Sequence, residues 1–143
     1  MLSRTMTQAK SQRALGLDLS KPILVQKALE KGLPYDSLKT FSQDTALPVS
    51  ELSRILGISE NTLLRRKNAN RLETDESDRL LRIATLHQLV LELFHGRVKA
   101  AFDWLTEPHP YFDGDTPLDM AKTEYGAKRV ETLVQRLIHG VLV

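Results

Sequence analysis

The sequence of 143 residues contains no cysteine, which excludes disulfide bonds and metal sites built from thiolates. No apolar run approaches the ~20 residues that a membrane-spanning helix requires, so no membrane partner is expected. Residues 1–18 lack the apolar core of a secretory signal. Because Arg4, Lys10 and Arg13 come before the first acidic residue, Asp18, we interpret residues 1–19 as a flexible basic N-terminal arm.

The motifs of several enzyme classes are also missing. The sequence has no G-x-S-x-G motif, no P-loop and no G-x-G-x-x-G motif. Its four histidines lack the spacing of zinc ligands. Asp113, Asp115 and Asp119 lack the remaining ligands of a calcium loop, and turn and capping roles explain all three. We therefore expect no catalytic residue, no metal and no cofactor, and a protein that is not an enzyme.

The charge of the chain is divided unequally between its two halves. The composition, 41% hydrophobic and 27% charged residues, is that of a globular protein, with a net charge of only +2. Residues 20–72 carry +4, whereas residues 73–143 carry −4. A basic half suits a polyanion such as DNA, and an acidic half is better placed against another protein.

The stretch from Ser50 to Lys67 has the pattern of a helix-turn-helix. Gly57 follows a short apolar-faced helix, where a positive φ is easiest to place. Ser59 is placed to cap a second helix with its hydroxyl. A surface helix of an ordinary helical protein is the alternative interpretation. The glycine at the turn, the capped second helix and three adjacent basic residues favour DNA binding.

The second helix of this motif carries the side chains that can read DNA. Amide, hydroxyl and guanidinium groups there can reach base edges and phosphates. We expect Asn61, Thr62 and Arg65 to reach the major groove. The predicted DNA-binding residues are Ser59, Asn61, Thr62, Arg65, Arg66, Lys67 and Arg71, the last three of which are basic and are expected to hold phosphates.

The residues that begin and end helices predict an all-α fold. It consists of an N-terminal helix-turn-helix bundle and a C-terminal helical domain. Four short helices are expected between Ser20 and Asn70, with Ser20 capping the first. Thr74 is a candidate cap for a long helix that runs to about His95. Thr116, with Pro117 after it, begins another helix, and Gly126 is expected to interrupt the chain before the last one. The predicted units are 1–19, 20–72 with the helix-turn-helix, 73–96 and 97–143.

The long helix after Thr74 has more apolar residues than one stripe can hold. Such a helix must be covered on more than one face. It is therefore either the central strut between two subdomains or a dimer interface. We interpret residues 73–96 as a connecting and dimerisation helix and expect a homodimer, whose two-fold symmetry would present two helix-turn-helix motifs to DNA.

The C-terminal pattern resembles a known family. Its marks are A-F-D-W-L at 101–105, T-P-L-D-M at 116–120, then Gly126, Val130, Leu133, Leu137 and Gly140. This succession is similar to the toxin-binding domain of Xre-type antitoxins (the ParS, MbcA and Xre family), the partners of RES-domain toxins in bacterial type II toxin–antitoxin modules. With the helix-turn-helix, the resemblance covers about residues 20–143.

The resemblance implies an antitoxin whose C-terminal domain, residues 97–143, covers the active site of an NAD-consuming toxin. It also implies a dimer that represses its own operon by binding operator DNA, and a location in the bacterial cytoplasm, associated with the nucleoid. One position departs from the family. Arg66 occupies a usually apolar site, so either the helix docks differently or one of the basic residues is purely structural.

The predicted toxin-binding residues comprise motif residues, two acidic side chains and the end of the chain. Trp104, Gly114 and Gly126 are open to a second interpretation, as core or turn residues. Glu124 and Glu131 could pair with cationic groups that bind a pyrophosphate. The full set is Trp104, Gly114, Pro117, Glu124, Gly126, Glu131, Arg136, His139, Gly140, Val141, Leu142 and Val143.

A second function from another class is compatible with the same residues. The chain could be a simple helix-turn-helix transcriptional regulator whose C-terminal half dimerises or binds an effector. A scaffolding protein with an incidental basic face is a third and weaker interpretation. A neighbouring gene for a RES-type toxin separates the first interpretation from the others.

Overall fold

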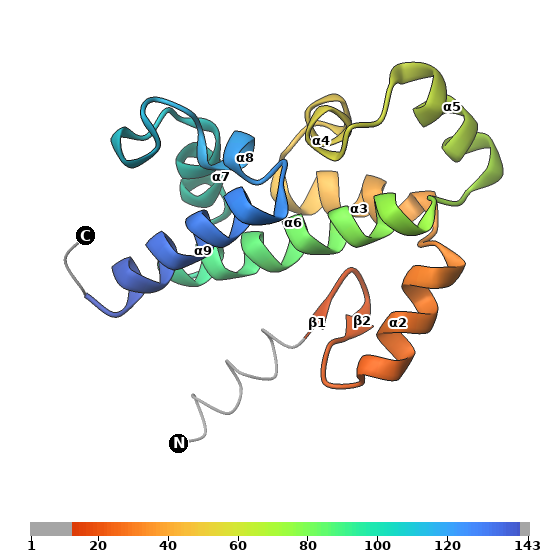
Figure 1. The fold of residues 1–143 in the computed structure, drawn as a ribbon, viewed down its shortest axis with the longest axis horizontal. Helices are drawn as coiled ribbons and strands as arrows, with labels where there is room; N and C mark the ends of the chain where they lie inside the picture. Colours follow the sequence, from red (N-terminus) through yellow and green to blue (C-terminus); the bar gives the residue numbers. More distant parts are fainter. Residues whose placement is uncertain (1–12, 141–143) are drawn as a thin grey trace.

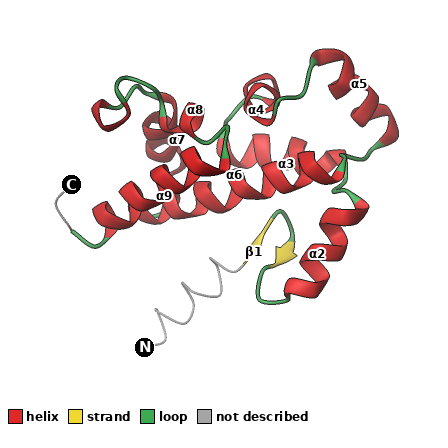
Figure 2. Cartoon of the chain, in the orientation of Figure 1, coloured by secondary structure: helices red, strands yellow, loops and turns green. Residues whose placement is uncertain are grey.

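Glycine or proline marks the ends of several helices, such as Gly32 after α2 and Gly57 after α4, and the helices have 4 to 20 residues. The computed structural model describes residues 13–140 and is helical apart from one short hairpin (Figure 2), so the predicted all-α fold is confirmed. None of the helices that it describes is long and apolar enough to cross a membrane. The elements are β1 (Arg13–Ala14), β2 (Leu17–Asp18), α2 (Pro22–Lys31), α3 (Tyr35–Thr45), α4 (Val49–Leu56), α5 (Glu60–Ala69), α6 (Thr74–Leu93), α7 (Val98–Thr106), a 3₁₀ turn (Pro110–Phe112), α8 (Pro117–Met120) and α9 (Glu124–Ile138).

Helix α6 is the long central element around which the others gather (Figure 1). Helix α9 lies along it and runs in the same direction, while α2, α4, α7 and β1 contact it elsewhere. Its residues Leu80, Leu86 and Val90 are almost fully buried. Several helices of the same chain therefore bury the many apolar residues of α6. This arrangement fits the interpretation of the helix as a central strut between two subdomains. A homodimer remains a prediction.

The four helices expected between Ser20 and Asn70 are present as α2 to α5. Gly57 ends α4 with φ 73°, and Ser59 caps α5 by accepting a hydrogen bond from the amide of Thr62 at 3.2 Å. Both local predictions are confirmed. Only Gly57 and Ile58 separate α4 from the cap of α5, and this short turn sets the two helices of the motif at an angle (Figure 1).

The C-terminal helices follow the predicted caps with one exception. Thr116 accepts a hydrogen bond from the amide of Asp119 at 3.0 Å, and Pro117 occupies the first turn of α8. The predicted interruption at Gly126 is wrong. This glycine lies in the first turn of α9, where its amide donates to the hydroxyl of the N-cap residue Thr123 at 3.0 Å.

The N-terminal segment differs from the expected arm over residues 13–19. Strands β1 and β2 pair as an antiparallel hairpin around Leu15 and Gly16, whose φ angles of 54° and 77° suit a tight two-residue turn. Ala14 is only 5% exposed, and Leu17 packs against the core. The apolar residues of this short segment therefore tie it to the molecule. The rest of the expected arm, residues 1–12, lies outside the described residues.

Two predicted caps lie one residue away from the observed ones. The hydroxyl of Ser20 donates to Asp18 at 2.6 Å, and Lys21 is the N-cap residue of α2. Glu73 instead of Thr74 caps α6, in a reciprocal capping box with Glu76. The Ser20 hydroxyl is engaged by Asp18, and the cap residue of α2 makes no side-chain hydrogen bond. At α6, the carboxylate of Glu73 is a stronger acceptor than the predicted hydroxyl of Thr74.

Candidate nucleic-acid interface and protein-binding surface

Helix α5 stands out from the body of the molecule (Figure 1) and has no buried residue. Its cap, Ser59, starts it, and Asn70 ends it in the left-handed conformation with φ 51°. Asn61, Arg65 and Lys67 are exposed, as expected of groups that contact DNA. The helix thus presents an amide and two cations to the solvent.

A short chain of hydrogen bonds orders the first turn of α5. The hydroxyl of Ser59 donates to Oγ1 of Thr62 at 3.0 Å, and Nη2 of Arg65 donates to the same oxygen at 3.0 Å. The guanidinium of Arg65 is thereby directed toward the N-terminal end of the helix. In helix-turn-helix proteins, this end of the second helix contacts base edges. Thr62 and Arg65 are thus presented together.

Arg66 is half-buried and paired with carboxylates of the same chain. Its Nε and Nη2 donate to the two carboxylate oxygens of Glu76 at 2.8 and 3.1 Å, and Glu73 lies 3.7 Å from Nη1. The side chain of Arg66 is 19% exposed, and hydrogen bonding to Glu76 raises the pKa of its guanidinium. Arg66 is thus engaged in an intramolecular ion pair, and its phosphate contact stays a prediction.

Arg71 is also engaged within the chain. Its Nη1 donates to the carbonyl oxygens of Lys31 and Gly32 at 3.1 and 3.0 Å, at the C-terminal end of α2. A cation is stabilised at this end of a helix, where unpaired carbonyls accumulate. Arg71 thus links α2 to the segment after α5, and its phosphate contact stays a prediction. Of the predicted phosphate contacts, Lys67 keeps an ammonium with no partner within the described residues.

The predicted toxin-binding residues divide by exposure. Pro117 and Gly126 are buried, and Trp104 is half-buried with its ring edge against His109, 5.8 Å between centroids. Val141, Leu142 and Val143 lie outside the described residues. The remaining members are exposed: Gly114, Glu124, Glu131, Arg136, His139 and Gly140. The exposed members gather mainly on α9 and at its end.

Gly126 has a structural reason to be glycine. A Cβ atom at this position would lie 1.7 Å from the carbonyl oxygen of Met120. Helix α9 therefore begins in direct contact with the backbone that ends α8. A predicted partner contact is here a contact within the chain, which fits the alternative left open for this residue.

Sequence reasoning missed two large exposed side chains of α9. Tyr125 is 73% exposed, with the guanidinium of Arg129 5.6 Å from its ring centre, and Leu137 is 41% exposed. Tyr125 lies two positions before the buried Ala127, about 200° around the helix, so it faces away from the core. The position of this aromatic residue outside the apolar stripe of the helix could have identified it from the sequence as an exposed side chain. Exposed aromatic residues are the usual anchors of protein interfaces.

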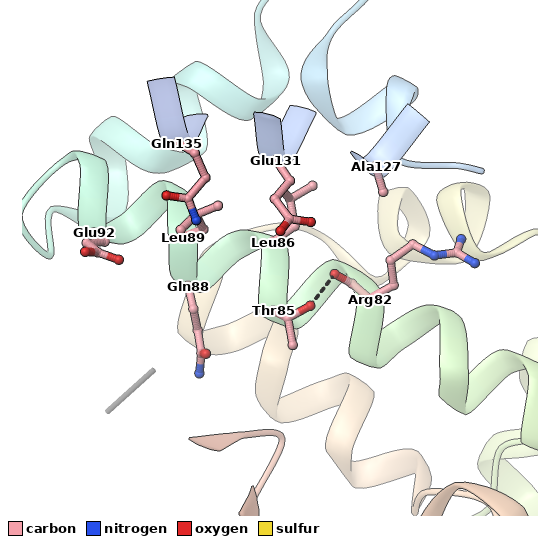
Figure 3. Close-up of a pocket in the computed structure, with 9 residues that line it drawn as sticks. All are labelled: Arg82, Thr85, Leu86, Gln88, Leu89, Glu92, Ala127, Glu131 and Gln135. Carbon is pink, nitrogen blue, oxygen red and sulfur yellow. Dashed lines mark hydrogen bonds between the residues drawn. The ribbon is translucent and has the colours of Figure 1, made fainter. Parts of the chain in front are cut away.

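A shallow groove of about 220 Å³ runs between α6 and α9 (Figure 3). Glu131 and Gln135 point from α9 toward α6, and Arg82 lies at one end of the groove. Glu131 is thus placed at this groove, with its carboxylate exposed and unpaired within residues 13–140. Groups of three or more metal-ligating side chains are absent from the part of the chain that the structure describes.

An ion pair joins the two halves of the molecule. Nη1 of Arg54 on α4 lies 2.8 Å from Oδ1 of Asp119 on α8, and Thr116 donates to the other carboxylate oxygen at 3.1 Å. Burial raises the pKa of Asp119, but hydrogen bonds from Arg54 and Thr116 outweigh it and leave the pKa below its usual value. Asp119, the aspartate of the T-P-L-D motif, thus contacts both Arg54 of the helix-turn-helix and Thr116, the N-cap residue of α8.

Comparison with known proteins gives two family matches along the chain. Residues 25–84 match the antitoxin Xre-like helix-turn-helix domain, and residues 89–140 match the antitoxin Xre/MbcA/ParS C-terminal toxin-binding domain. An Antitoxin Xre from Yersinia enterocolitica is 28% identical over 90% of this chain and 88% of its own length. One from Photorhabdus laumondii is 28% identical over 91% and 88%. One from Pseudomonas putida is 36% identical over 48% of this chain and 43% of its own length.

Proposed function

We propose, from the premise that the chain belongs to the Xre antitoxin family, that it neutralises an NAD-consuming toxin of the RES class and represses its own operon. The antitoxin role and the two domains, helix-turn-helix and toxin-binding, follow from the family. The identity of the toxin, the occlusion of its active site and the autorepression are the proposal. In this account the protein works in the bacterial cytoplasm, beside the nucleoid where its operator lies.

The exposed face and end of α9 support the proposed toxin contact best. This helix carries Tyr125 and Leu137, two apolar side chains left uncovered among the described residues. The same helix exposes Glu124 and Glu131. Apolar burial contributes about 25 cal/mol per Å² removed from water, and carboxylates can compete for the cationic groups that bind a pyrophosphate. Such a surface suits the mouth of a dinucleotide site.

The chain end is proposed to enter the toxin's NAD⁺ site. Deleting residues 140–143 should then weaken neutralisation while operator binding and the urea midpoint stay near those of the full chain, because Gly140 is exposed and α9 with its buried residues ends before it. Co-expression with the toxin, followed by cell growth and NAD⁺ level, measures the effect. An inactive toxin variant controls for the cost of expression. Full protection by a chain ending at His139 would show that the tail is dispensable.

The helix-turn-helix is proposed to bind the promoter of its own operon. Support comes from the exposed Asn61, Arg65 and Lys67 and from the charge of +4 over residues 20–72. The alternative, a simple regulator with a C-terminal dimerisation or effector domain, would bind its operator equally well. A RES-domain gene beside this one, and binding of its product, distinguishes the two.

We retain the domain limits 20–72, 73–96 and 97–143 as a proposal. The two family matches end and begin inside α6, at residues 84 and 89, so α6 belongs in part to both. This helix packs along α9 and against α4. Residues 73–96 are therefore best regarded as the element shared by the DNA-binding and toxin-binding parts.

A homodimer is proposed with α6 at or beside the interface. Leu81 and Leu89 of α6 are only half-buried beside the groove with α9, and a second copy would cover them. Light scattering of the isolated chain should give twice the chain mass of 16.2 kDa. Replacing Leu89 by glutamate should shift the mass toward one chain, whereas Glu92→Gln should not. A single-chain mass for the unaltered protein at micromolar concentration would rule out the dimer.

A further inference from the structure

The orientation of α5 depends very little on apolar packing. None of its residues is buried, Leu64 is 57% exposed, and Leu63 is only partly covered by the core. Its two ends are tied, by the turn at Ile58 and by the amide of Leu72, which donates to the carbonyl of Leu33 at 2.8 Å. Two tied ends fix the axis of the helix but leave its rotation about that axis, and so the directions of its side chains, to other contacts.

The bidentate pair of Arg66 and Glu76 supplies the contact that fixes them. Two parallel N–H···O bonds, 2.8 and 3.1 Å long, join the planar guanidinium to the planar carboxylate. The side chain of Glu76 is 9% exposed and that of Arg66 is 19% exposed, so water screens the pair weakly. A bidentate pair constrains direction as well as distance, which a single ammonium contact cannot do.

Glu76 is itself held rigidly on the other side of this contact. It is the N3 residue of α6, and its Oε1 accepts a hydrogen bond from the amide of Glu73 at 2.8 Å, which closes the capping box. The positive end of the α6 dipole favours a carboxylate in this turn. The carboxylate is therefore a fixed point on the central helix, and Arg66 connects α5 to it.

We infer that Glu76 is a positioning residue for operator recognition, which holds the DNA-reading helix α5 in its binding orientation through Arg66. The inference rests on the proposed DNA-binding function. Glu76 touches no nucleic acid in this account. It acts by keeping Asn61, Thr62 and Arg65 at a fixed angle to the rest of the domain, so that they meet base edges together.

The direction in which operator affinity changes when Glu76 is replaced distinguishes a positioning role from a general effect of its negative charge. Removing a carboxylate near a DNA-binding surface makes that surface more positive, which strengthens binding to any duplex. Loss of orientation weakens binding to the operator alone, since base contacts need geometry and phosphate contacts need mainly charge. Glu76→Gln should therefore lower operator affinity by at least tenfold while affinity for an unrelated duplex stays equal or rises.

The experiment compares two DNA probes of equal length, the region upstream of the gene and an unrelated duplex, at several salt concentrations. Glutamine can still accept the capping-box hydrogen bond, so Glu76→Gln removes the charge and spares the cap. Asp78→Asn is the matched control, because Asp78 is exposed in the same helix and has no ion-pair partner within residues 13–140. The control should keep the operator preference.

A second variant tests the other partner without removing its charge. Arg66→Lys keeps the cation but loses the bidentate geometry, so it should lose operator preference and keep the salt slope. If Arg66 held a phosphate instead, lysine would preserve much of the operator affinity. The plot of log affinity against log salt concentration falls with a negative slope. Lys67→Gln should make that slope less steep by about 0.9, the value of one phosphate contact.

The outcomes distinguish the inference from the function on which it rests. An unaltered chain that shows no preference for the upstream DNA overturns the proposed function, and the inference with it. An unaltered chain that prefers the upstream DNA, with the preference intact in both Glu76→Gln and Arg66→Lys, overturns the inference alone. Equal loss of affinity for both probes would also overturn it, because that result reports unfolding of α5.

Discussion

Replacing Gly126 by alanine should destabilise the protein by about 3 kcal/mol or more, toward the upper end of overpacking effects. The added Cβ would meet the carbonyl oxygen of Met120 at 1.7 Å, and because that atom belongs to the backbone, it cannot turn aside as a flexible side chain would. Helix propensity alone predicts the opposite sign, a gain of up to about 1 kcal/mol for alanine over glycine inside a helix. The junction of α8 with α9 would have to open.

The measurement is the urea midpoint of the variant, read together with its toxin neutralisation. Gly96→Ala is the matched control, since a Cβ there meets nothing within 4 Å and only the φ of +83° opposes it, at about 1–2 kcal/mol. We expect Gly126→Ala to lose much more stability than the control and to lose neutralisation with it. Similar urea midpoints in the two variants would show that the close approach does not matter.

Replacing both Arg65 and Lys67 by alanine should nearly abolish operator binding. One lost base contact costs about 1–3 kcal/mol, and one lost phosphate contact adds to it. We expect a rise of roughly a hundredfold in the operator Kd at moderate salt, because 1.4 kcal/mol corresponds to a factor of ten. The urea midpoint should not move, since both side chains are exposed.

The matched control for that double variant removes two cations from the other half of the chain. Lys128 and Arg129 are exposed on α9, and replacing both by alanine changes the net charge by the same amount. Fluorescence anisotropy with labelled upstream DNA measures both variants. Operator binding that is equally weak in the two variants would mean that overall charge, and not the surface of α5, carries the affinity.

Local signals in the sequence predicted the parts of the fold that depend on neighbouring residues. Ser59 caps α5 and Thr116 caps α8 as expected, because a cap needs only a hydroxyl and an amide two or three positions later. Gly57 ends α4 because a left-handed residue is required there. The resemblance of the C-terminal motifs added the family, which no cap or apolar stripe could identify.

Features that depend on contacts across the fold were beyond sequence reasoning. In the sequence, Arg66 and Lys67 are adjacent basic residues that look alike. Only the fold shows that Arg66 lies against Glu76 of α6, whereas Lys67 stays exposed. Gly126 was placed at a break because its contact with Met120 cannot be read from spacing. The hairpin at residues 13–18 was missed because two-residue strands carry too short a pattern.

The two halves of the molecule share one continuous core and are not independent units. Helix α6 contributes to both parts, and Arg54 on α4 meets Asp119 on α8 at 2.8 Å. Point variants of the full chain are therefore better tests than isolated fragments. A fragment that ends before α9 would expose Leu86 and Val90 of α6 to water and would fail for reasons of folding.

The most direct test of the antitoxin account is co-expression of the unaltered chain with its proposed partner, a RES-domain toxin from the same operon. Cell growth and intracellular NAD⁺ are measured with the toxin alone, with the toxin and this chain, and with the toxin and the folded double variant at Arg65 and Lys67. The account predicts that the toxin alone depletes NAD⁺ and stops growth, and that both forms of the chain restore them. NAD⁺ depletion that persists in the presence of the folded, unaltered chain would contradict the account.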